Sequence, residues 1–169
     1  MIYFLLAVKR KKRYFTVITY IGIEQRGNKL FKLHSQLTKD TIFIGKFELS
    51  QLLIHKDANY PWFILVPMLP NISEIHHLLS DEAIQLIKES NLLSETMSEI
   101  FAPDKINIAA LGNMVPQLHL HHVARYKNDI SWPNPIWGNK PSTKYNKKNL
   151  KFRIESLVLA ISRKGYNII

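Results

Sequence analysis

The sequence predicts an α+β protein with an antiparallel sheet. Several short hydrophobic stretches have the pattern of strands, whereas one long stretch has the spacing of an amphipathic helix, and this combination favours that class. The chain has 169 residues, which fits one domain, and its 46% of hydrophobic residues is enough to build a core. It contains no cysteine, which excludes disulfide bonds and thiolate metal sites.

Hydrophobic periodicity and turn residues locate the strands. A turn is predicted around Gly45 and Lys46, and Pro67 ends a continuous hydrophobic run. The predicted strands are, in order, residues 42–54 (two strands joined by the turn), 62–67, 105–111 and 117–125.

The long helix is predicted to begin at Ser80, because a serine followed by two acidic residues is typical of a helix start. Apolar residues then recur at helical spacing up to Pro103. A short helical turn is expected within residues 72–79. A second amphipathic helix is predicted at residues 150–163, packed on the body of the protein or on a partner.

The N-terminus begins with eight mostly apolar residues, followed by the basic run at residues 9–13. A secretory signal has the opposite order, and a membrane span needs about 20 apolar residues. We therefore expect no membrane insertion and a cytoplasmic location. Residues 14–20 have the composition of a further strand.

The most informative stretch is residues 112–123, which alternates apolar and polar residues at the period of a strand. The alternation predicts that Gln117, His119 and His121 share one face, with His122 on the other. Histidine near neutral pH serves as acid, base, ligand or nucleophile. Three interpretations follow: buried structural histidines, a metal site, or nucleophilic catalysis. The pattern offers only two metal ligands and no acidic residue at ligand spacing, which disfavours a metal.

These residues resemble the signature of the histidine triad (HIT) family of hydrolases and transferases, in which three histidines alternate with apolar residues. In that register Gln117 takes the place of the first histidine, and His119 and His121 take the second and third. A bacterial subgroup with glutamine first has the same pattern. Trp132 and Pro133, which follow the signature, and the polar turn before residues 62–67 extend the similarity to about residues 34–138.

The resemblance implies a HIT-like fold, with about five antiparallel strands and one long helix across them, and commonly a two-fold dimer. It also implies that His119 attacks the α-phosphorus of a nucleotide and that His121 assists the leaving group. Asn113, in the loop before the signature, would hold phosphate oxygens. Gln117 would orient the phosphate or a histidine, although an amide cannot carry a proton through a catalytic cycle.

Two further residues are candidates for nucleotide binding by the same resemblance. Asp57 lies near the place of a ribose-binding residue, and a surface turn before Pro61 is its alternative role. Asn107 resembles an asparagine near the phosphate, and a buried structural hydrogen bond is its alternative role.

The net charge of +10 is concentrated at the two ends of the chain. Residues 1–33 and 139–169 each carry eight basic residues and one acidic residue, whereas residues 34–138 carry seven basic and eleven acidic ones. We therefore divide the chain into a basic N-terminal extension, a HIT-like domain and a basic C-terminal tail with these bounds. A nucleic-acid groove across the domain is disfavoured, because any sequence-independent attraction would come from the ends.

The predicted function is that of a hydrolase or nucleotidyl transferase. It would cleave a nucleoside phosphoanhydride or phosphoramidate, such as a dinucleoside polyphosphate, through a nucleotidyl-histidine intermediate. A purine nucleotide substrate and a homodimer are expected, with no cofactor, metal, nucleic acid or membrane partner. Two alternatives stay open: a nucleotide-binding protein without turnover, because the triad is incomplete, and a basic accessory protein of nucleic acids.

Overall fold

The computed structural model describes residues 30–139 and 141–168. The chain divides into two compact units, Met1–Phe31 and Lys32–Ile169, and the larger unit contains every element described below. The strand predicted at residues 14–20 lies outside the described residues. No described helix combines the length and the hydrophobicity that a membrane span requires.

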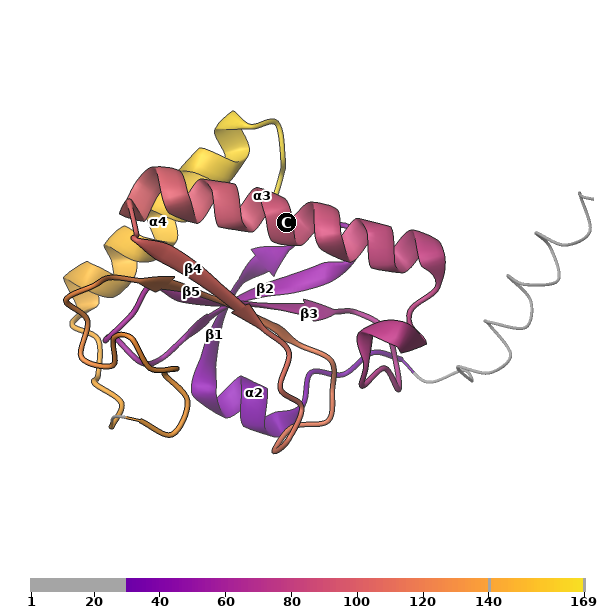
Figure 1. Cartoon of the computed structure of the whole chain (residues 1–169). Coiled ribbons are helices and arrows are strands. Elements are labelled where there is room, and N and C mark those ends of the chain that lie inside the picture. Colours follow the sequence, from indigo (N-terminus) through magenta and orange to yellow (C-terminus); the bar gives the residue numbers. More distant parts are fainter. Residues whose placement is uncertain (1–29, 140, 169) are drawn as a thin grey trace, which may run out of the picture. The chain divides into compact units, whose positions relative to one another are not determined.

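Five antiparallel strands form one sheet in the order β1-β2-β3-β5-β4 (Figure 1). The strands are β1 (Thr41–Lys46), β2 (Ser50–His55), β3 (Trp62–Pro67), β4 (Lys105–Ala109) and β5 (Leu120–Arg125). Every neighbouring pair is antiparallel. The predicted α+β class and the expected number of strands are confirmed.

The hairpin between β1 and β2 turns later than predicted. Gly45 lies inside β1, and the turn is closed by a hydrogen bond from the backbone N–H of Phe47 to the carbonyl of Ser50, at 2.8 Å. Ile168 packs directly against Gly45, and a Cβ atom at this position would collide with the isoleucine side chain. This glycine is therefore explained by a close approach of the C-terminal segment and not by a turn.

The long helix α3 (Ser80–Phe101) lies across one face of the sheet, as predicted (Figure 1). Its first turn is fixed by the side chain of Glu82, which accepts a hydrogen bond from the backbone N–H of Leu79 at 2.8 Å. It ends where Ala102 adopts a left-handed conformation, with φ 42°, just before Pro103. Leu86, Leu93 and Met97 are buried against the sheet in the main hydrophobic core.

The C-terminal helix α4 (Lys147–Arg163) packs against α3 within the same compact unit. It begins three residues before the predicted start, because the side chain of Asn146 accepts a hydrogen bond from the backbone N–H of Asn149 at 2.7 Å and caps the helix. Leu157 and Ile161 are fully buried in the core. The helix therefore packs on the body of the protein, one of the two arrangements expected for it.

Two short helices complete the unit: α2 (Ser35–Asp40), which was not predicted, and the 3₁₀ turn η1 (Ile75–His77), which lies within residues 72–79.

The central strands present different side chains to the two faces of the sheet. On β3, Phe63 and Leu65 belong to the core under the helices, whereas Trp62 and Ile64 project to the opposite face. This follows from the two-residue period of a strand. The face opposite α3 and α4 is therefore available for polar side chains.

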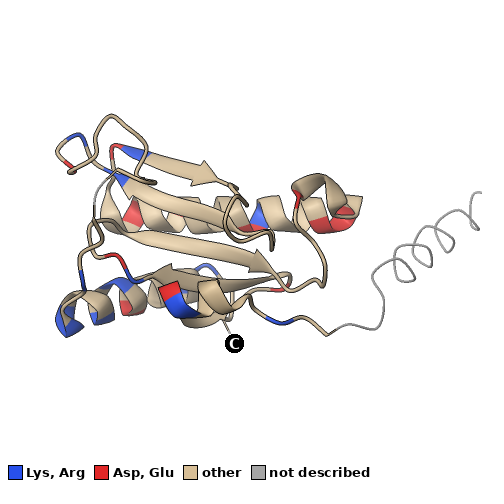
Figure 2. Ribbon diagram, turned by 90° about the horizontal axis from the view of Figure 1, so that it is seen from below, with Lys and Arg blue, Asp and Glu red and all other residues tan. Residues whose placement is uncertain are grey.

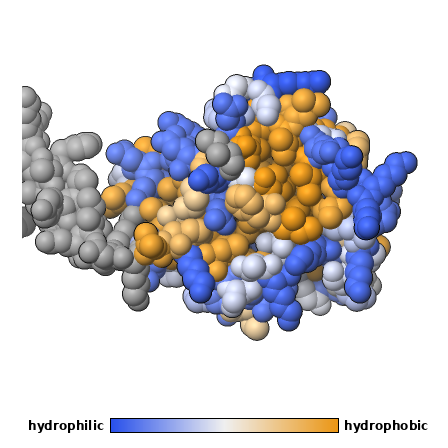
Figure 3. Space-filling view, turned by 180° about the vertical axis from the view of Figure 1, so that it is seen from behind, coloured by the Kyte–Doolittle hydropathy of each residue, from blue (hydrophilic) through white to orange (hydrophobic). Residues whose placement is uncertain are grey.

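Charged and apolar residues are distributed unevenly on the surface. Basic residues gather at the start of α4, and the strands carry few charges along their length (Figure 2). On the side of the molecule opposite the view of Figure 1, hydrophobic residues gather between hydrophilic ones (Figure 3). Exposed hydrophobic side chains include Phe43 on β1 and Phe152 and Leu159 on α4. Few of the basic residues in the described part of the chain therefore lie on the sheet.

Candidate active site

Strand β5 starts at Leu120, three residues later than predicted, so Gln117 and His119 precede it in irregular chain. The cause lies in the neighbouring strand. The antiparallel register of β3 and β5 would bring Pro67 opposite Leu118, and proline has no N–H to donate. The N–H of Leu118 instead bonds to the carbonyl of Ile72, at 2.8 Å.

A pocket of about 520 Å³ opens on the face of the sheet opposite α3. Helix α2, the end of β2, strand β3, the loop at residues 111–115 and Trp137 form its walls, and His119 and His121 line it. The other lining side chains are mostly apolar. Pockets of this size and composition, with a few convergent polar groups, suit small organic ligands.

His119 is held with one nitrogen free. Its Nδ1 lies 2.6 Å from the backbone carbonyl oxygen of Gln117, which only accepts hydrogen bonds, so Nδ1 carries the proton. In the neutral ring, Nε2 then has the lone pair. Burial lowers the pKa of His119, and His34 nearby lowers it further, against the opposing effect of the bond to Gln117. His119 is therefore neutral near pH 7, with an available nucleophilic nitrogen.

His121 has the opposite tautomer. The indole N–H of Trp62 donates to its Nδ1 at 3.0 Å, so Nδ1 is the acceptor and Nε2 carries the proton of the neutral ring. Burial, followed by the neighbouring His119, His55 and His122, lowers the pKa of His121 to about 3. The rings of His119 and His121 are 4.8 Å apart and nearly perpendicular. The pocket thus pairs a nitrogen acceptor with a nitrogen donor.

A third histidine, His55, lines the same pocket and was not among the predicted site residues. Its ring stacks on Trp62 with centroids 3.8 Å apart, and its Nδ1 accepts the backbone N–H of Asp57 at 3.1 Å. Burial lowers its pKa, more than Asp57 and Asp40 raise it. The sequence offered one sign of this placement: His55 directly follows the strands predicted at residues 42–54, so strand pairing brings it opposite Trp62 at the start of β3.

Gln117 turns both polar atoms of its side chain away from the pocket. Its Oε1 accepts the backbone N–H of His34 at 2.8 Å, and its Nε2 donates to the carbonyl of Lys32 at 3.0 Å. The side chain therefore holds the segment that leads into α2. It is not among the residues that line the pocket.

The three predicted binding residues lie in different places. Asn113 lines the pocket, in a loop where Gly112 adopts a φ of 70°. Asp57 does not line it, and its Oδ1 accepts the backbone N–H groups of Asn59 and Thr143, both at 3.0 Å. Asn107 also lies outside the lining. The structure thus brings His119, His121 and Asn113 together and uses Gln117, Asp57 and Asn107 elsewhere.

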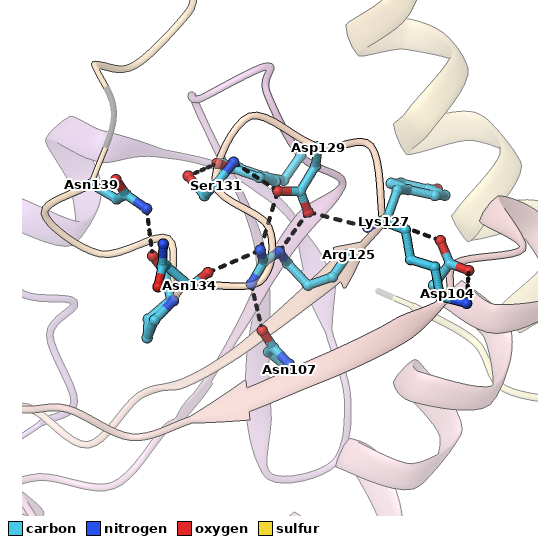
Figure 4. Close-up of polar contacts among 11 residues, drawn as sticks. Asp104, Asn107, Arg125, Lys127, Asp129, Ser131, Asn134 and Asn139 are labelled. Atoms are coloured by element: carbon cyan, nitrogen blue, oxygen red, sulfur yellow. Dashed lines mark hydrogen bonds and ion pairs between the residues drawn. The ribbon is translucent and has the colours of Figure 1, made fainter.

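Asn107 belongs to a buried cluster around Arg125, at the end of β5 (Figure 4). The guanidinium donates to Oδ1 of Asn107 at 2.8 Å, to both carboxylate oxygens of Asp129 at 2.7 and 3.1 Å, and to the carbonyl of Asn134 at 3.0 Å. Burial alone would raise the pKa of Asp129, but hydrogen bonds from Arg125 and from two backbone N–H groups hold it below its usual value. This cluster fixes the segment that carries Trp137 to the pocket.

No group of three or more histidine, aspartate or glutamate side chains in the described part of the chain is arranged to hold a metal ion. Asp40 is the acidic residue among those that line the pocket, and the rings next to the imidazoles are those of Trp62 and Trp137.

The profile of the HIT domain matches residues 36–128. The chain belongs to the histidine triad family. Members of this family are generally nucleotide hydrolases and transferases. The comparison with curated proteins gives no match.

Solved structures of other histidine triad proteins superpose closely. A protein from Bradyrhizobium japonicum is 44% identical, with a TM-score of 0.78, over 79% of this chain and 99% of its own. One from Marinobacter aquaeolei VT8 is 42% identical, with a TM-score of 0.77, over 80% and 98%. A Zn-bound family member from Mycobacterium smegmatis is 14% identical, with a TM-score of 0.53, over 78% and 92%, and it shares the fold. The predicted HIT-like fold is confirmed.

Proposed function

We propose that this protein cleaves a nucleoside phosphoanhydride or phosphoramidate, such as a dinucleoside polyphosphate, at the α-phosphate, through a nucleotidyl intermediate on His119. The observation that carries this proposal is the pair of opposite tautomers. A nucleotidyl transfer needs a lone pair to attack phosphorus and a hydrogen-bond donor to stabilise the charge on the departing group. His119 offers the first and His121 offers the second, side by side in one pocket.

In the first half of the reaction, Nε2 of His119 attacks the α-phosphorus, and the bond from phosphorus to the bridging oxygen or nitrogen breaks. The ring of His119 becomes positively charged, and its Nδ1–H already points at the carbonyl of Gln117, which stabilises that charge. The Nε2–H of the neutral His121 donates a hydrogen bond to the departing atom and stabilises the negative charge that develops there, while a basic leaving group takes its proton from water. Water or another acceptor then attacks the phosphorus, the bond from phosphorus to Nε2 of His119 breaks, and the attacking group loses its proton to solvent.

Non-bridging phosphate oxygens gain negative charge during both steps. Residues 112–115 line the pocket, and we assign the amide of Asn113 and the backbone N–H groups of this loop as the donors to these oxygens. Such donors act most strongly where burial excludes water and where they are fixed before the reaction.

Gln117 takes a positioning role in this scheme. Both polar atoms of its amide are engaged with backbone groups of Lys32 and His34, and its own carbonyl orients His119. We propose that the chain belongs to a bacterial subgroup in which glutamine replaces the first histidine and the remaining two carry the chemistry. A purine nucleotide, a homodimer and a cytoplasmic location are parts of the same proposal, drawn from the family resemblance.

A nucleotide-binding protein without turnover is the second candidate, and the replacement of the first histidine by Gln117 is the observation that favours it. Its pocket would be the same, and its distinguishing property is tight nucleotide binding with no covalent intermediate.

Intact-mass spectrometry separates the two candidates. The wild-type protein is mixed briefly with a diadenosine polyphosphate or with an adenosine phosphoramidate and then quenched without acid. We expect a nucleotidyl adduct that is labile to acid, accompanied by release of AMP, and its absence from His119→Ala. His122→Ala is the matched control, because His122 lies on the other side of β5, and it retains the adduct. Binding of the nucleotide without adduct or product would contradict catalysis and favour the binding protein.

A further inference from the structure

We propose that Trp62 is a positioning residue that fixes the proton of His121 on Nε2, the nitrogen available to the leaving group. The consequence for catalysis rests on the proposed function. The position of the proton does not, because it is a property of the protein without substrate.

The contact itself allows one assignment. An indole N–H is a donor and never an acceptor, and the Nε1 of Trp62 lies 3.0 Å from Nδ1 of His121. The Nδ1 atom must therefore have its lone pair directed at the indole. In a neutral imidazole the proton then resides on Nε2.

The indole ring of Trp62 is itself held firmly. One face stacks on the ring of His55 at 3.8 Å, and Trp137 approaches it edge-on with centroids 6.2 Å apart. Trp62 is also the first residue of β3 and pairs with Val123 of β5. The ring of His55 is fixed in turn by the backbone N–H of Asp57. These contacts favour the orientation in which the indole N–H is directed at His121.

The other tautomer would be unsuitable in two ways. A proton on Nδ1 would face the N–H of Trp62, which leaves two buried donors opposed and unbonded. It would also leave Nε2 of His121 as a lone pair beside the lone pair of His119. Oxygens of a phosphate are acceptors and would then meet no donor from this histidine.

Trp137 supplies a matched control. Its indole lies at 5.5 Å from the ring of His121 and also touches Trp62, but its buried N–H has no hydrogen-bond partner in the described part of the protein. Replacing either tryptophan by phenylalanine removes an indole N–H from the same aromatic cluster. Only the replacement of Trp62 removes a hydrogen bond to His121.

The deciding experiment is nitrogen NMR of the unliganded protein with ¹⁵N-labelled histidine and tryptophan. In the wild type and in Trp137→Phe, we expect His121 to show an unprotonated Nδ1 and a protonated Nε2. In Trp62→Phe, we expect the two tautomers to mix. A scalar coupling across the N–H···N bond from Trp62 to His121 gives the same answer in the wild type, even if the Trp62 variant does not fold. A protonated Nδ1, or no coupling, would overturn the proposal.

Kinetics test the consequence for the leaving group. With a phosphoramidate or an unactivated ester, we expect kcat of Trp62→Phe to fall by about five- to tenfold, the size that one hydrogen bond allows. With a nitrophenyl ester, whose leaving group needs no proton, we expect little change. An equal loss with both leaving groups would contradict positioning and indicate a general structural defect.

Failure of the wild type to turn over any nucleotide would count against the proposed function and leave the NMR result to decide the proton position.

Discussion

Two adjacent histidines on β5 show how the two faces of one strand differ. His121 faces the pocket, whereas His122 faces α3, where its Nε2 lies 2.7 Å from the hydroxyl of Ser90 and its Nδ1 lies 3.2 Å from the carbonyl of Leu120. Burial is the largest cause of a low pKa in both, about 3 for His121 and about 4 for His122. Burial and pKa therefore do not separate them. The difference is that both nitrogens of His122 are occupied, while His121 keeps Nε2 for a ligand.

Alanine variants of His121 and His122 should show the largest difference in kcat between the two faces of β5. For His121→Ala we expect kcat to fall by about 10²- to 10³-fold, the usual contribution of a preorganised hydrogen-bond donor. For His122→Ala we expect near wild-type kcat per folded molecule but a lower free energy of unfolding, because a buried ring is lost. Steady-state kinetics and urea unfolding on both variants measure the two effects. A similar loss of kcat in both would mean that the faces are not functionally distinct.

The pH dependence of stability should report on His122, which faces α3. The pKa of His122 in the folded protein, about 4, lies below the unfolded value near 6.5, so the unfolded chain takes up the proton first. This contribution to stability is complete above pH 6.5 and is lost as the pH falls towards 4, by roughly 3 kcal/mol. Urea unfolding at pH 7 and pH 4 should show a smaller loss for His122→Leu than for the wild type. An unchanged loss would show that His122 is already protonated or does not titrate.

A smaller effect is expected from Ser90. Ser90→Ala leaves Nε2 of His122 buried without its donor, and we expect it to cost about 1–3 kcal/mol of unfolding free energy. Combining it with His122→Leu removes both polar partners, so the double variant should lose less than the sum of the two single variants. Thermal or urea unfolding of the wild type, the two single variants and the double variant completes this double-mutant cycle. Strict additivity would show that the two side chains do not interact.

The smallest effect should come from Gln117, whose side chain lies outside the pocket that His121 lines. Gln117→Ala removes two partly exposed hydrogen bonds to Lys32 and His34, and we expect a loss of about 1–2 kcal/mol in unfolding free energy. The backbone carbonyl that orients His119 remains, so kcat should change by no more than a few-fold. A fall in kcat comparable to that of His121→Ala would instead give the amide a direct part in the reaction.

The alternation of residues along the chain was sufficient to predict the sheet and the opposite placement of His121 and His122, because strand periodicity is a local property. Two details needed information from elsewhere in the fold. Strand β5 starts late because Pro67 on β3 offers no N–H, and Gly45 serves a contact with Ile168 that lies far along the chain. The proton positions of the histidines were also beyond the sequence, because each depends on a partner from another strand or loop.

The candidate site residues also divide into those that a local motif predicts and those that depend on the rest of the fold. His119 and His121 were found because their spacing is a motif, whereas His55 depends on the register between β2 and β3. Asp57 and Asn107 were proposed from resemblance, and in the structure their side chains bond a backbone segment and Arg125, respectively. The catalytic and binding roles of all these residues, including His119, His121, Gln117 and Asn113, stay predictions.

The opposite tautomers of the pocket also bear on transition metals. A metal ion binds an imidazole only through an unprotonated nitrogen directed at it. Of the three histidines that line the pocket, His119 presents such a nitrogen, while Nδ1 of His121 and of His55 each already accept an N–H. A zinc ion would have to displace the indole of Trp62 or shift a proton before it gained a second ligand. The arrangement that we propose for phosphate chemistry therefore also makes the pocket a poor chelator, which would leave the proposed nucleophile His119 free of metal.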